Sequence, residues 1–435
     1  MKIKGLNEEK IKQISKFKGE DNKTLNYRLN CYKLFKETPL PKFGPTINLN
    51  FDNINYYQTR EDNLTDNWNN ITNDTKDELT SLGVISSEKY LDGIGVQYQS
   101  EVIYHNMLKE LEEKKVIFTS IENAFINHRD LIDKYFSKIV KPNENKFTAL
   151  NGAVFSGGSF IYIPPNTKLN RPLQSYFRIS SKDLGQFERT LIIVDDNSSL
   201  HYVEGCTAKS YSTSNLHAAV VEIYVGKNST CRYSTIQNWA TNVYNLVTKR
   251  ALVEENGTME WIDGNIGSHK TMKYPCCVLK GDNSKGTCIT ISVAKKDQHQ
   301  DSGARMIHLG KNTTSNIISK SIASLSGKAD FRGEVRIEKE ATNSSSIVKC
   351  DTLILDKSSS SDAYPINTVK NKSSNIEHEA TVSKISEEKL FYLMSRGLTK
   401  DQATDLIVLG FTDEFKKELP MEYAVELNQL LKQNL

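Results

Sequence analysis

The chain has 435 residues, of which 38% are hydrophobic and 25% charged, a composition ordinary for a globular protein with a substantial core. Its 56 basic and 53 acidic side chains are mixed along the sequence and leave a formal charge of +3, so the concentrated basic stripe of a nucleic-acid-binding protein is missing. No apolar run is long enough to span a bilayer, and the first residues, MKIKGLNEEKIKQ, lack the apolar stretch of a secretory signal.

The N-terminal part of the sequence, residues 1–145, predicts a helical region. Asn7 precedes a run that places Ile11 and Ile14 on one helical face, residues 87–114 look helical, and residues 121–139 repeat apolar side chains at helical spacing. Between these segments, residues 39–74 are rich in Asn, Asp and Thr, which predicts a loop.

Residues 146–376 change to short β-branched and aromatic runs bounded by polar turns, such as residues 190–194, 218–225, 232–236, 289–293 and 346–353. An asparagine recurs in these turns at intervals of 31, 28, 27, 29, 31 and 28 residues, at Asn197, Asn228, Asn256, Asn283, Asn312, Asn343 and Asn371. A period of this size predicts a β-solenoid, in which asparagine supplies the left-handed backbone at each corner. A β-sandwich or a β-meander is the alternative that the pattern leaves open.

The last part of the chain, residues 377–435, returns to helical spacing. Ser386 begins one predicted helix, Thr399 with Gln402 forms a capping-box pattern for a second, and Pro420 begins a third. Three short helices after a solenoid either cover its end or present an apolar face to a partner.

Seven cysteines, an odd number without a disulfide-like spacing, predict reduced thiols in a reducing compartment; they are Cys31, Cys206, Cys231, Cys276, Cys277, Cys288 and Cys350. Cys206 stands out because it follows Glu204 and Gly205 at the end of a strand-like run, where a thiolate at a bend is accessible. The plainer interpretation is a buried structural thiol.

Cys350 and the tripeptide Glu377-His378-Glu379 are the second candidate site. A thiolate, an imidazole and carboxylates are ligands that iron and zinc accept, and the 27 residues between Cys350 and Glu377 match one solenoid period. Adjacent rungs lie about 5 Å apart, so the four residues are expected to share one open site. The alternative is a small core cysteine and an exposed polar loop before a helix.

Several enzyme signatures are missing from the sequence. It has no GxxxxGK[ST] phosphate loop, no GxSxG elbow and no HExxH zinc motif, so the chain is not expected to hydrolyse ATP by itself. A carbohydrate-cleaving β-helix needs two paired carboxylates, and no pair of acids stands out. A passive structural subunit is a third possibility, which the combination of Cys206 with the Glu-His-Glu triplet disfavours.

Seven stretches, GQFERTLII, YVEGCTA, LHAAVVE, YSTIQNW, VTKRAL, IEHEATVSKI and ELPMEYAVE, occur in this order between residues 185 and 426. They resemble the SufB scaffold family of the SUF iron–sulfur cluster assembly system. The resemblance implies a right-handed parallel β-helix core at residues 146–376, between a helical region at 1–145 and a C-terminal helical region at 377–435. It implies a non-enzymatic scaffold for building iron–sulfur clusters from persulfide sulfur.

The partners that the resemblance implies are proteins. They are a SufC-type ATPase docked on the C-terminal helices, a SufD-type paralogue or a second SufB copy joined through the β-helix, and a SufS-type cysteine desulfurase that donates sulfur directly or through a SufE-type shuttle. No nucleic acid and no membrane span are expected. The cofactors implied are a transient iron–sulfur cluster, expected as 4Fe–4S, and a reduced flavin on the complex.

Residue by residue, Cys206 matches the sulfur-accepting cysteine of the family, and Cys350 the cysteine where the nascent cluster is built. Glu377, His378 and Glu379 match the adjacent metal-binding triplet, in which Glu379 is the expected ligand with Cys350.

Four more residues match the lining of a path between the two cysteines: Arg178, Gln237, Trp239 and Lys249. Ser180 stands where the family usually has Asn. The Asn-rich composition is similar to that of plastid-encoded members, which implies a plastid stroma or apicoplast, or else a bacterial cytoplasm.

Overall fold

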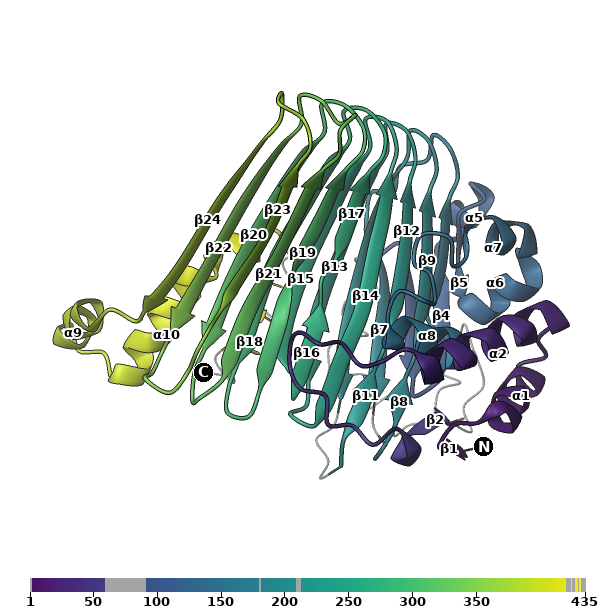
Figure 1. Ribbon diagram of the computed structural model, residues 1–435, viewed down its shortest axis with the longest axis horizontal. Coiled ribbons are helices and arrows are strands. Elements are labelled where there is room, and N and C mark those ends of the chain that lie inside the picture. Colours follow the sequence, from purple (N-terminus) through teal and green to yellow (C-terminus); the bar gives the residue numbers. More distant parts are fainter. Residues whose placement is uncertain are drawn as a thin grey trace.

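Two long sheets face each other and form a parallel β-solenoid (Figure 1). The computed structural model describes residues 2–58, 91–179, 181–208 and 213–419, together with 424, 427, 428, 430 and 431. The chain passes from one sheet to the other and back, and successive strands of each sheet pair in parallel, apart from one antiparallel pair at the N-terminal end of each sheet. The mainly β fold, the β-solenoid predicted from the turn period and the parallel β-helix implied by the resemblance are therefore confirmed.

Sheet 1 consists, in spatial order, of β24 (Asn375–Lys384), β22 (Ser345–Ile354), β20 (Thr314–Ala323), β18 (Lys285–Ala294), β15 (Thr258–Gly267), β13 (Thr230–Trp239), β10 (Ser199–Ala208), β7 (Leu173–Ile179), β3 (Gly93–Tyr98) and β4 (Glu101–Met107). Sheet 2 consists of β23 (Ala363–Val369), β21 (Lys328–Ile337), β19 (His299–His308), β16 (Lys270–Lys273), β14 (Val243–Val253), β12 (Val220–Val225), β9 (Arg189–Val194), β6 (Ser159–Ile163) and β5 (Ile117–Ser120), with the short strands β8 (Gly185–Gln186), β11 (Asn215–His217) and β17 (Cys276–Leu279).

Asparagines turn the chain at one corner of the solenoid. Six of the seven predicted corner residues have a left-handed backbone, with φ between 54° and 58°, which asparagine tolerates better than most residues. Neighbouring corners are also linked, because the Asn228 side chain donates to Asn197 and that of Asn256 donates to Asn228. Asn371 is the exception: its side chain instead donates to two backbone carbonyls of the preceding turn.

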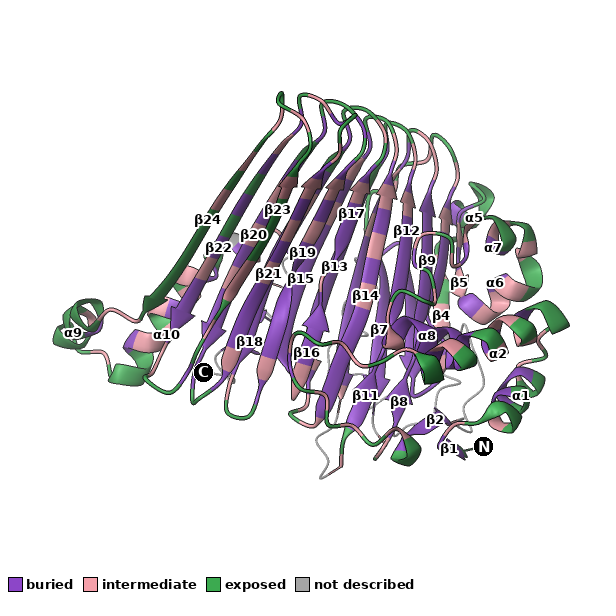
Figure 2. Ribbon diagram, viewed as in Figure 1, coloured by how far each residue is buried: buried purple, intermediate pink, exposed green. Residues whose placement is uncertain are grey.

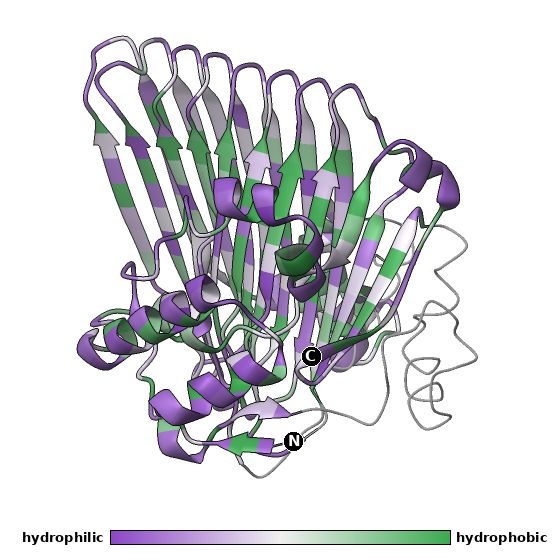
Figure 3. Cartoon of the chain, turned by 90° about the vertical axis from the view of Figure 1, so that its right-hand side faces the viewer, coloured by the Kyte–Doolittle hydropathy of each residue, from purple (hydrophilic) through white to green (hydrophobic). Residues whose placement is uncertain are grey.

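The space between the two sheets is filled by side chains from alternate strand positions. One continuous buried cluster contains Tyr202, Tyr233, Trp261, Phe331 and Cys350 together with many aliphatic residues. The strand burial and the alternation of hydropathy along the strands are visible in Figures 2 and 3. Among the described strands of the two long sheets, β23 and β24 are the ones in which most residues are exposed.

The N-terminal elements cover the outer face of sheet 2 and the opposite end of the solenoid; they are β1 (Lys2–Lys4), α1 (Glu8–Phe17), α2 (Asn22–Glu37), the 3-10 helix η1 (Phe51–Asn53), β2 (Asn55–Gln58), α5 (Lys109–Glu113), α6 (Ile121–Asn127), α7 (Arg129–Tyr135) and α8 (Lys146–Val154). Phe35 and Phe147 from α2 and α8 pack on Leu246 and Met272 of sheet 2. The predicted first helix is confirmed: Asn7 caps α1, and Ile11 and Ile14 lie on its buried face.

The C-terminal helices α9 (Glu387–Ser395), α10 (Lys400–Phe411) and α11 (Asp413–Lys417) follow the last strand. Val408 and Phe415 pack against Ile236, Ile262 and Ile289 on the outer face of sheet 1. Ser386 caps α9 and the capping box of α10 is present, as predicted. The helix predicted from Pro420 lies largely outside the described residues.

Two predicted helices are wrong. Residues 93–107 form the antiparallel strands β3 and β4, because Ile94, Val96 and Tyr98 alternate with a period of two; residues 87–90 lie outside the described part of the chain. The single helix predicted over 121–139 is two helices, α6 and α7, which are separated at His128, where φ is −133° and ψ is 44°.

Solenoid strands extend past both predicted boundaries of the β region. On the N-terminal side β3 pairs with β7, and on the C-terminal side β24 runs to Lys384. The division of the chain into three domains stays a prediction. Among the described helices, none is long and apolar enough to cross a membrane.

Candidate functional site

Cys206 lies near the end of β10 with its side chain between the two sheets. The thiol is fully buried, its Sγ lies 3.6 Å from Glu204 Oε1, and Gln237 Nε2 lies 4.0 Å away on the next strand. Burial raises the pKa of Cys206 well above its ordinary value, and the charges of Glu204 and Glu188 raise it further, while Lys273 and Lys249 act in the opposite direction. The thiol is therefore protonated at neutral pH and shielded from solvent.

Two parallel rows of polar side chains cross sheet 1 on its inner face, from Cys206 to Cys350. The strand registers align them as Glu204, Thr235, Asp263, Thr290, Ser319 and Cys350 in one row and Cys206, Gln237, Asn265, Ser292, Ser321 and Thr352 in the other. All twelve residues are buried. We call these twelve residues the polar stripe; its five strand steps of about 4.8 Å make it about 24 Å long.

Two lysines from sheet 2 reach into the middle of the polar stripe. Lys249 Nζ lies 3.2 Å and Lys273 Nζ 3.0 Å from Asp263 Oδ1, and both lysines also bond the Thr235 hydroxyl. Burial alone would raise the pKa of Asp263, but the two ammonium groups outweigh it and lower the pKa to about 2. Burial lowers the pKa of Lys273 to about 8, against the opposing effect of Asp263. The solenoid interior thus contains a charged Asp between two cations.

A chain of hydrogen bonds connects Gln237 with a buried histidine. Gln237 Oε1 accepts from Asn245 at 2.9 Å, and His217 contacts Asn245 Oδ1 at 2.8 Å and Glu188 Oε2 at 2.6 Å. Although burial acts to lower the pKa of His217, Glu188 raises it above the ordinary value. The Trp239 ring lies 4.7 Å from the His217 ring. Gln237 and Trp239 therefore line the interior near Cys206, and Lys249 lines it at the middle of the polar stripe.

Arg178 lies elsewhere than expected. It pairs in register with Thr207, the residue after Cys206, and its guanidinium donates to the Thr207 hydroxyl at 2.6 Å. Since successive strand residues point to opposite faces, Arg178 faces the outside of sheet 1 and does not line the interior beside Cys206. Ser180 lies outside the described residues.

Cys350 lies on β22, the strand next to the end of sheet 1. The residue is 2% exposed and its side chain belongs to the buried cluster between the sheets. Burial, with a smaller effect of Asp351, raises the pKa of the thiol to about 12. Only β24 separates this thiol from the open end of sheet 1 within the described chain.

The Glu-His-Glu triplet lies in strand β24, not in a loop, and directly beside β22. Cys350 pairs with Ala380, and Lys349 pairs with Glu379. Because side chains alternate, His378 faces inward on the side of Cys350, with its ring 6.3 Å from the Phe331 ring, whereas Glu377 and Glu379 are exposed on the outer face. The expected adjacency of the rungs is confirmed. The prediction that all four residues share one site is wrong for Glu377 and Glu379, because their side chains lie on the face of sheet 1 opposite to that of Cys350.

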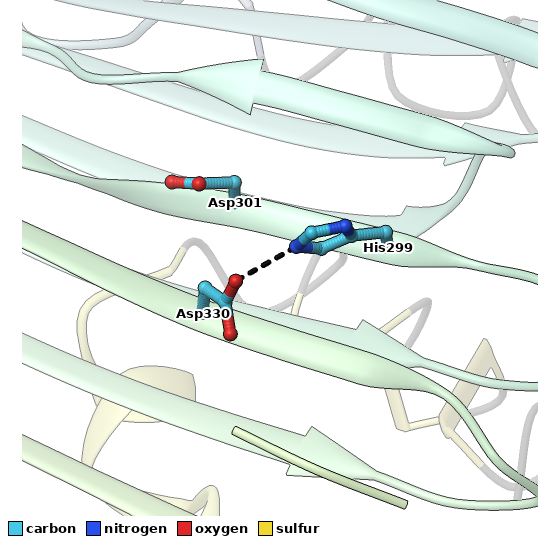
Figure 4. A group of neighbouring side chains, drawn as sticks. All are labelled: His299, Asp301 and Asp330. Carbon is cyan, nitrogen blue, oxygen red and sulfur yellow. Dashed lines mark hydrogen bonds and ion pairs between the residues drawn. The ribbon is translucent and has the colours of Figure 1, made fainter. Parts of the chain in front are cut away.

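A third group of potential metal ligands lies on the outer face of sheet 2, where His299, Asp301 and Asp330 offer ligand atoms within 4.8 Å of one another (Figure 4). Their charges are already balanced. Arg332 Nε bonds Asp301 at 2.9 Å, and Lys328 and the backbone N–H of Asp362 bond Asp330. This cluster is a structural ion-pair network.

Sequence reasoning missed the inward Asp263, Lys273 and His217. The sequence did contain a signal for Asp263. In β15 the side chains of Met259 and Trp261 face the core, and Asp263 and Asn265 follow them at the same spacing of two residues, so they face inward as well. A charged residue at an inward position of a solenoid strand is unusual enough to indicate function.

Comparison with known proteins agrees with this geometry. Residues 177–411 match the family model "SUF system FeS cluster assembly, SufBD core domain", and residues 96–175 match that of the SufBD protein N-terminal region. The chain is 52% identical over 431 residues to the iron–sulfur cluster assembly protein SufB of Bacillus subtilis, covering 99% of this chain and 93% of that protein. SufBD-family iron–sulfur cluster assembly proteins of Staphylococcus aureus and Staphylococcus saprophyticus are 54% identical over the same shares.

These relatives are bacterial, and the matches extend over nearly the whole chain. The parallel solenoid, the buried thiols Cys206 and Cys350 joined by the polar stripe, and the family matches lead to one conclusion: the chain belongs to the SufB and SufD family of SUF-system proteins, which act in iron–sulfur cluster assembly.

Proposed function

We propose that this protein is the scaffold on which a SUF complex builds iron–sulfur clusters, with Cys206 as sulfur acceptor and Cys350 as the anchor of the nascent cluster. The polar stripe is the observation that carries the proposal. Twelve buried polar or thiol positions in register across six strands are costly in a core, and they join these two cysteines.

Sulfur moves inside the solenoid along the polar stripe. A persulfide on Cys206 releases its outer sulfur as hydrosulfide when two electrons and one proton are supplied: Cys206–SSH + 2e⁻ + H⁺ gives Cys206–SH + HS⁻. A reduced flavin on the complex is the proposed electron source. Lys249 and Lys273 attract the anion, and the amides and hydroxyls of the stripe replace its water of hydration.

The cluster forms at the open end of the solenoid, with 4Fe–4S as the proposed product. Cys350 and Glu379 can hold the same iron only if β24 leaves its present register with β22, since the two side chains now point to opposite faces. The exposure of β23 and β24 supports such a change. A SufD-type subunit or a second copy docks on this edge in the present register, and ATP-driven motion of the SufC-type partner is the proposed cause of the change. His378 is the inward ligand of the triplet.

The C-terminal helices present a surface for the SufC-type ATPase. Phe391 on α9 is 74% exposed and Tyr392 58%, with Met394 and Leu406 also exposed, and such an apolar surface is typical of a protein interface. ATP hydrolysis belongs to that partner, and a SufS-type desulfurase, with or without a SufE-type shuttle, supplies the sulfur. A plastid stroma, an apicoplast or a bacterial cytoplasm is the proposed location.

The test is anaerobic reconstitution of the complex with iron and a persulfide donor, followed by absorbance of the iron–sulfur product. Cys350→Ser and Glu379→Ala are expected to lose the product, while Cys31→Ser, which removes a buried thiol outside the solenoid interior, keeps it. A Cys350→Ser complex that builds a full cluster would contradict the assignment.

A further inference from the structure

Cys206 is fully buried, so the proposed acceptor role, on which this inference rests, requires a route by which sulfur reaches the thiol. We looked for this route on the side of Cys206 that faces away from Cys350. On that side β10 pairs with β7, and β7 pairs with β3, so β7 and β3 continue the inner face of sheet 1 toward its N-terminal end.

A small pocket opens at this end of the solenoid, with room for one water-sized group, about 10 Å³. Its lining, which we call the inlet pocket, includes Gly95, His105, Phe118, Ser159, Ser175 and Phe177. Gly95 creates the space, because in the register of β3 and β7 it occupies the inward position opposite Ser175 and carries no side chain.

The inlet pocket lies one strand away from the acceptor thiol. Phe177 is the strand neighbour of Cys206, and Ser175 is the strand neighbour of Glu204. One strand spacing, about 4.8 Å, separates the backbones, and Phe177 and Cys206 belong to the same buried cluster. Phe177 is therefore the lining residue of the pocket that lies beside Cys206.

The pocket also contains polar groups that suit a sulfane sulfur. Ser175 and Ser159 hydroxyls lie 2.7 Å apart, and Ser159 contacts the Tyr202 hydroxyl at 3.0 Å. Burial lowers the pKa of His105 to about 4, so its ring is neutral at pH 7. The buried His105 Nε2 has no hydrogen-bond partner among the described residues, which leaves it for a molecule in the pocket.

We propose that the inlet pocket admits the outer sulfur of a persulfide to Cys206, with His105 and Ser175 contacting it and Phe177 moving aside. The Cys206 sulfur attacks the outer sulfur of the donor, forms the new S–S bond and breaks the bond to the donor sulfur. With inorganic disulfide the balance is Cys206–SH + HSS⁻ gives Cys206–SSH + HS⁻, and no oxidant is needed. Glu204 Oε1, next to the thiol, accepts its proton and returns it to the leaving sulfur.

The test fills the pocket without disturbing the thiol. A Cβ added at Gly95 would lie 3.4 Å from Ser175 Oγ, 3.5 Å from Phe118 and 3.7 Å from His105, ordinary contacts that the fold accepts. Gly264→Ala is the matched control, since its Cβ would also lie 3.4 Å or more from its neighbours, on the outer face of β15. Circular dichroism and thermal unfolding verify that each variant folds.

The measurement is the initial rate at which sodium disulfide places a persulfide on Cys206, read by alkylation and mass spectrometry of the intact chain. Gly95→Ala is expected to slow loading and Gly95→Val to slow it by about tenfold or more, equivalent to about 1.4 kcal/mol on the barrier; Gly264→Ala loads like the parent chain. Parent-like loading of folded Gly95→Val would overturn the inlet while leaving the acceptor role intact. A parent chain that loads no better than Cys206→Ser would instead overturn the proposed function.

Discussion

At the scale of single residues, the centre of the polar stripe contains one buried carboxylate that neutralises two buried ammonium groups only in part. Asp263 has two lysine partners, both within 3.2 Å. Removing one lysine leaves an ion pair, whereas removing the aspartate leaves two buried cations without their counter-charge. The carboxylate is thus the residue on which the stability of the site depends.

Asp263→Asn is expected to lower the free energy of unfolding by about 3–5 kcal/mol, the range for breaking a buried ion pair. Lys273→Met is expected to cost less than about 2 kcal/mol, because the pair of Lys249 with Asp263 remains. Urea unfolding of the two variants at pH 7 measures both. If both variants lost the same free energy of unfolding, this would contradict the pairing of both lysines with Asp263.

The Asp263 contribution also has a defined pH dependence. Its pKa is lowered in the folded protein to about 2, so its stabilising effect is present above the unfolded value of 3.8 and is lost as the pH falls toward 2. Asp263→Asn should therefore lose this part of the acid sensitivity.

At the scale of elements, β24 is an edge strand, and the backbone N–H groups that point away from β22 can be identified from its register. The N–H groups of Asn375 and Ile385 bond to Ser344 and Ile354 in the preceding turn and strand. Odd-numbered residues of β24 therefore bond β22, and even-numbered ones point to the open edge, since strand residues alternate. A strand from a second subunit would pair with the even-numbered residues, as expected for an unprotected edge.

Ala380→Pro removes an N–H that faces the open edge and is expected to abolish association with the second subunit while leaving thermal stability nearly unchanged. Thr381→Pro removes an N–H bonded to β22 and is expected to lower stability by about 1–3 kcal/mol. Size-exclusion chromatography with light scattering of the co-expressed complex reads the first effect, and thermal unfolding the second. A complex that survives Ala380→Pro would place the subunit contact elsewhere.

At the scale of the whole molecule, the sequence predicted the repeat and the corners well, because Asn at a left-handed corner is a local requirement. The sequence of β3 and β4 predicts a helix, but the segment forms strands because β3 pairs with β7, a contact between distant parts of the chain that the local pattern does not show. Which face Glu379 and Arg178 occupy also depended on register, because a shift of one residue exchanges the two faces of a strand. Local pattern and spacing made Cys206 and Cys350 candidates, and the family resemblance supplied their proposed roles.

In the proposed function, sulfur travels from Cys206 to Cys350 inside the solenoid. Ser292→Val fills a buried position midway along the polar stripe, where Ser292 contacts Ser302 at 2.7 Å. Ser234→Val is the matched control, a buried serine on the outer face of β13 that bonds His201.

The most direct measurement is the rate of cluster formation in the reconstituted complex with a persulfide donor, compared with free sulfide added from outside. For Ser292→Val we expect a normal amount of persulfide on Cys206. Cluster formation is expected to be slowed by about tenfold or more with the persulfide donor and to recover with free sulfide. Ser292→Val chains that build clusters from the persulfide donor as fast as Ser234→Val chains would contradict an internal route.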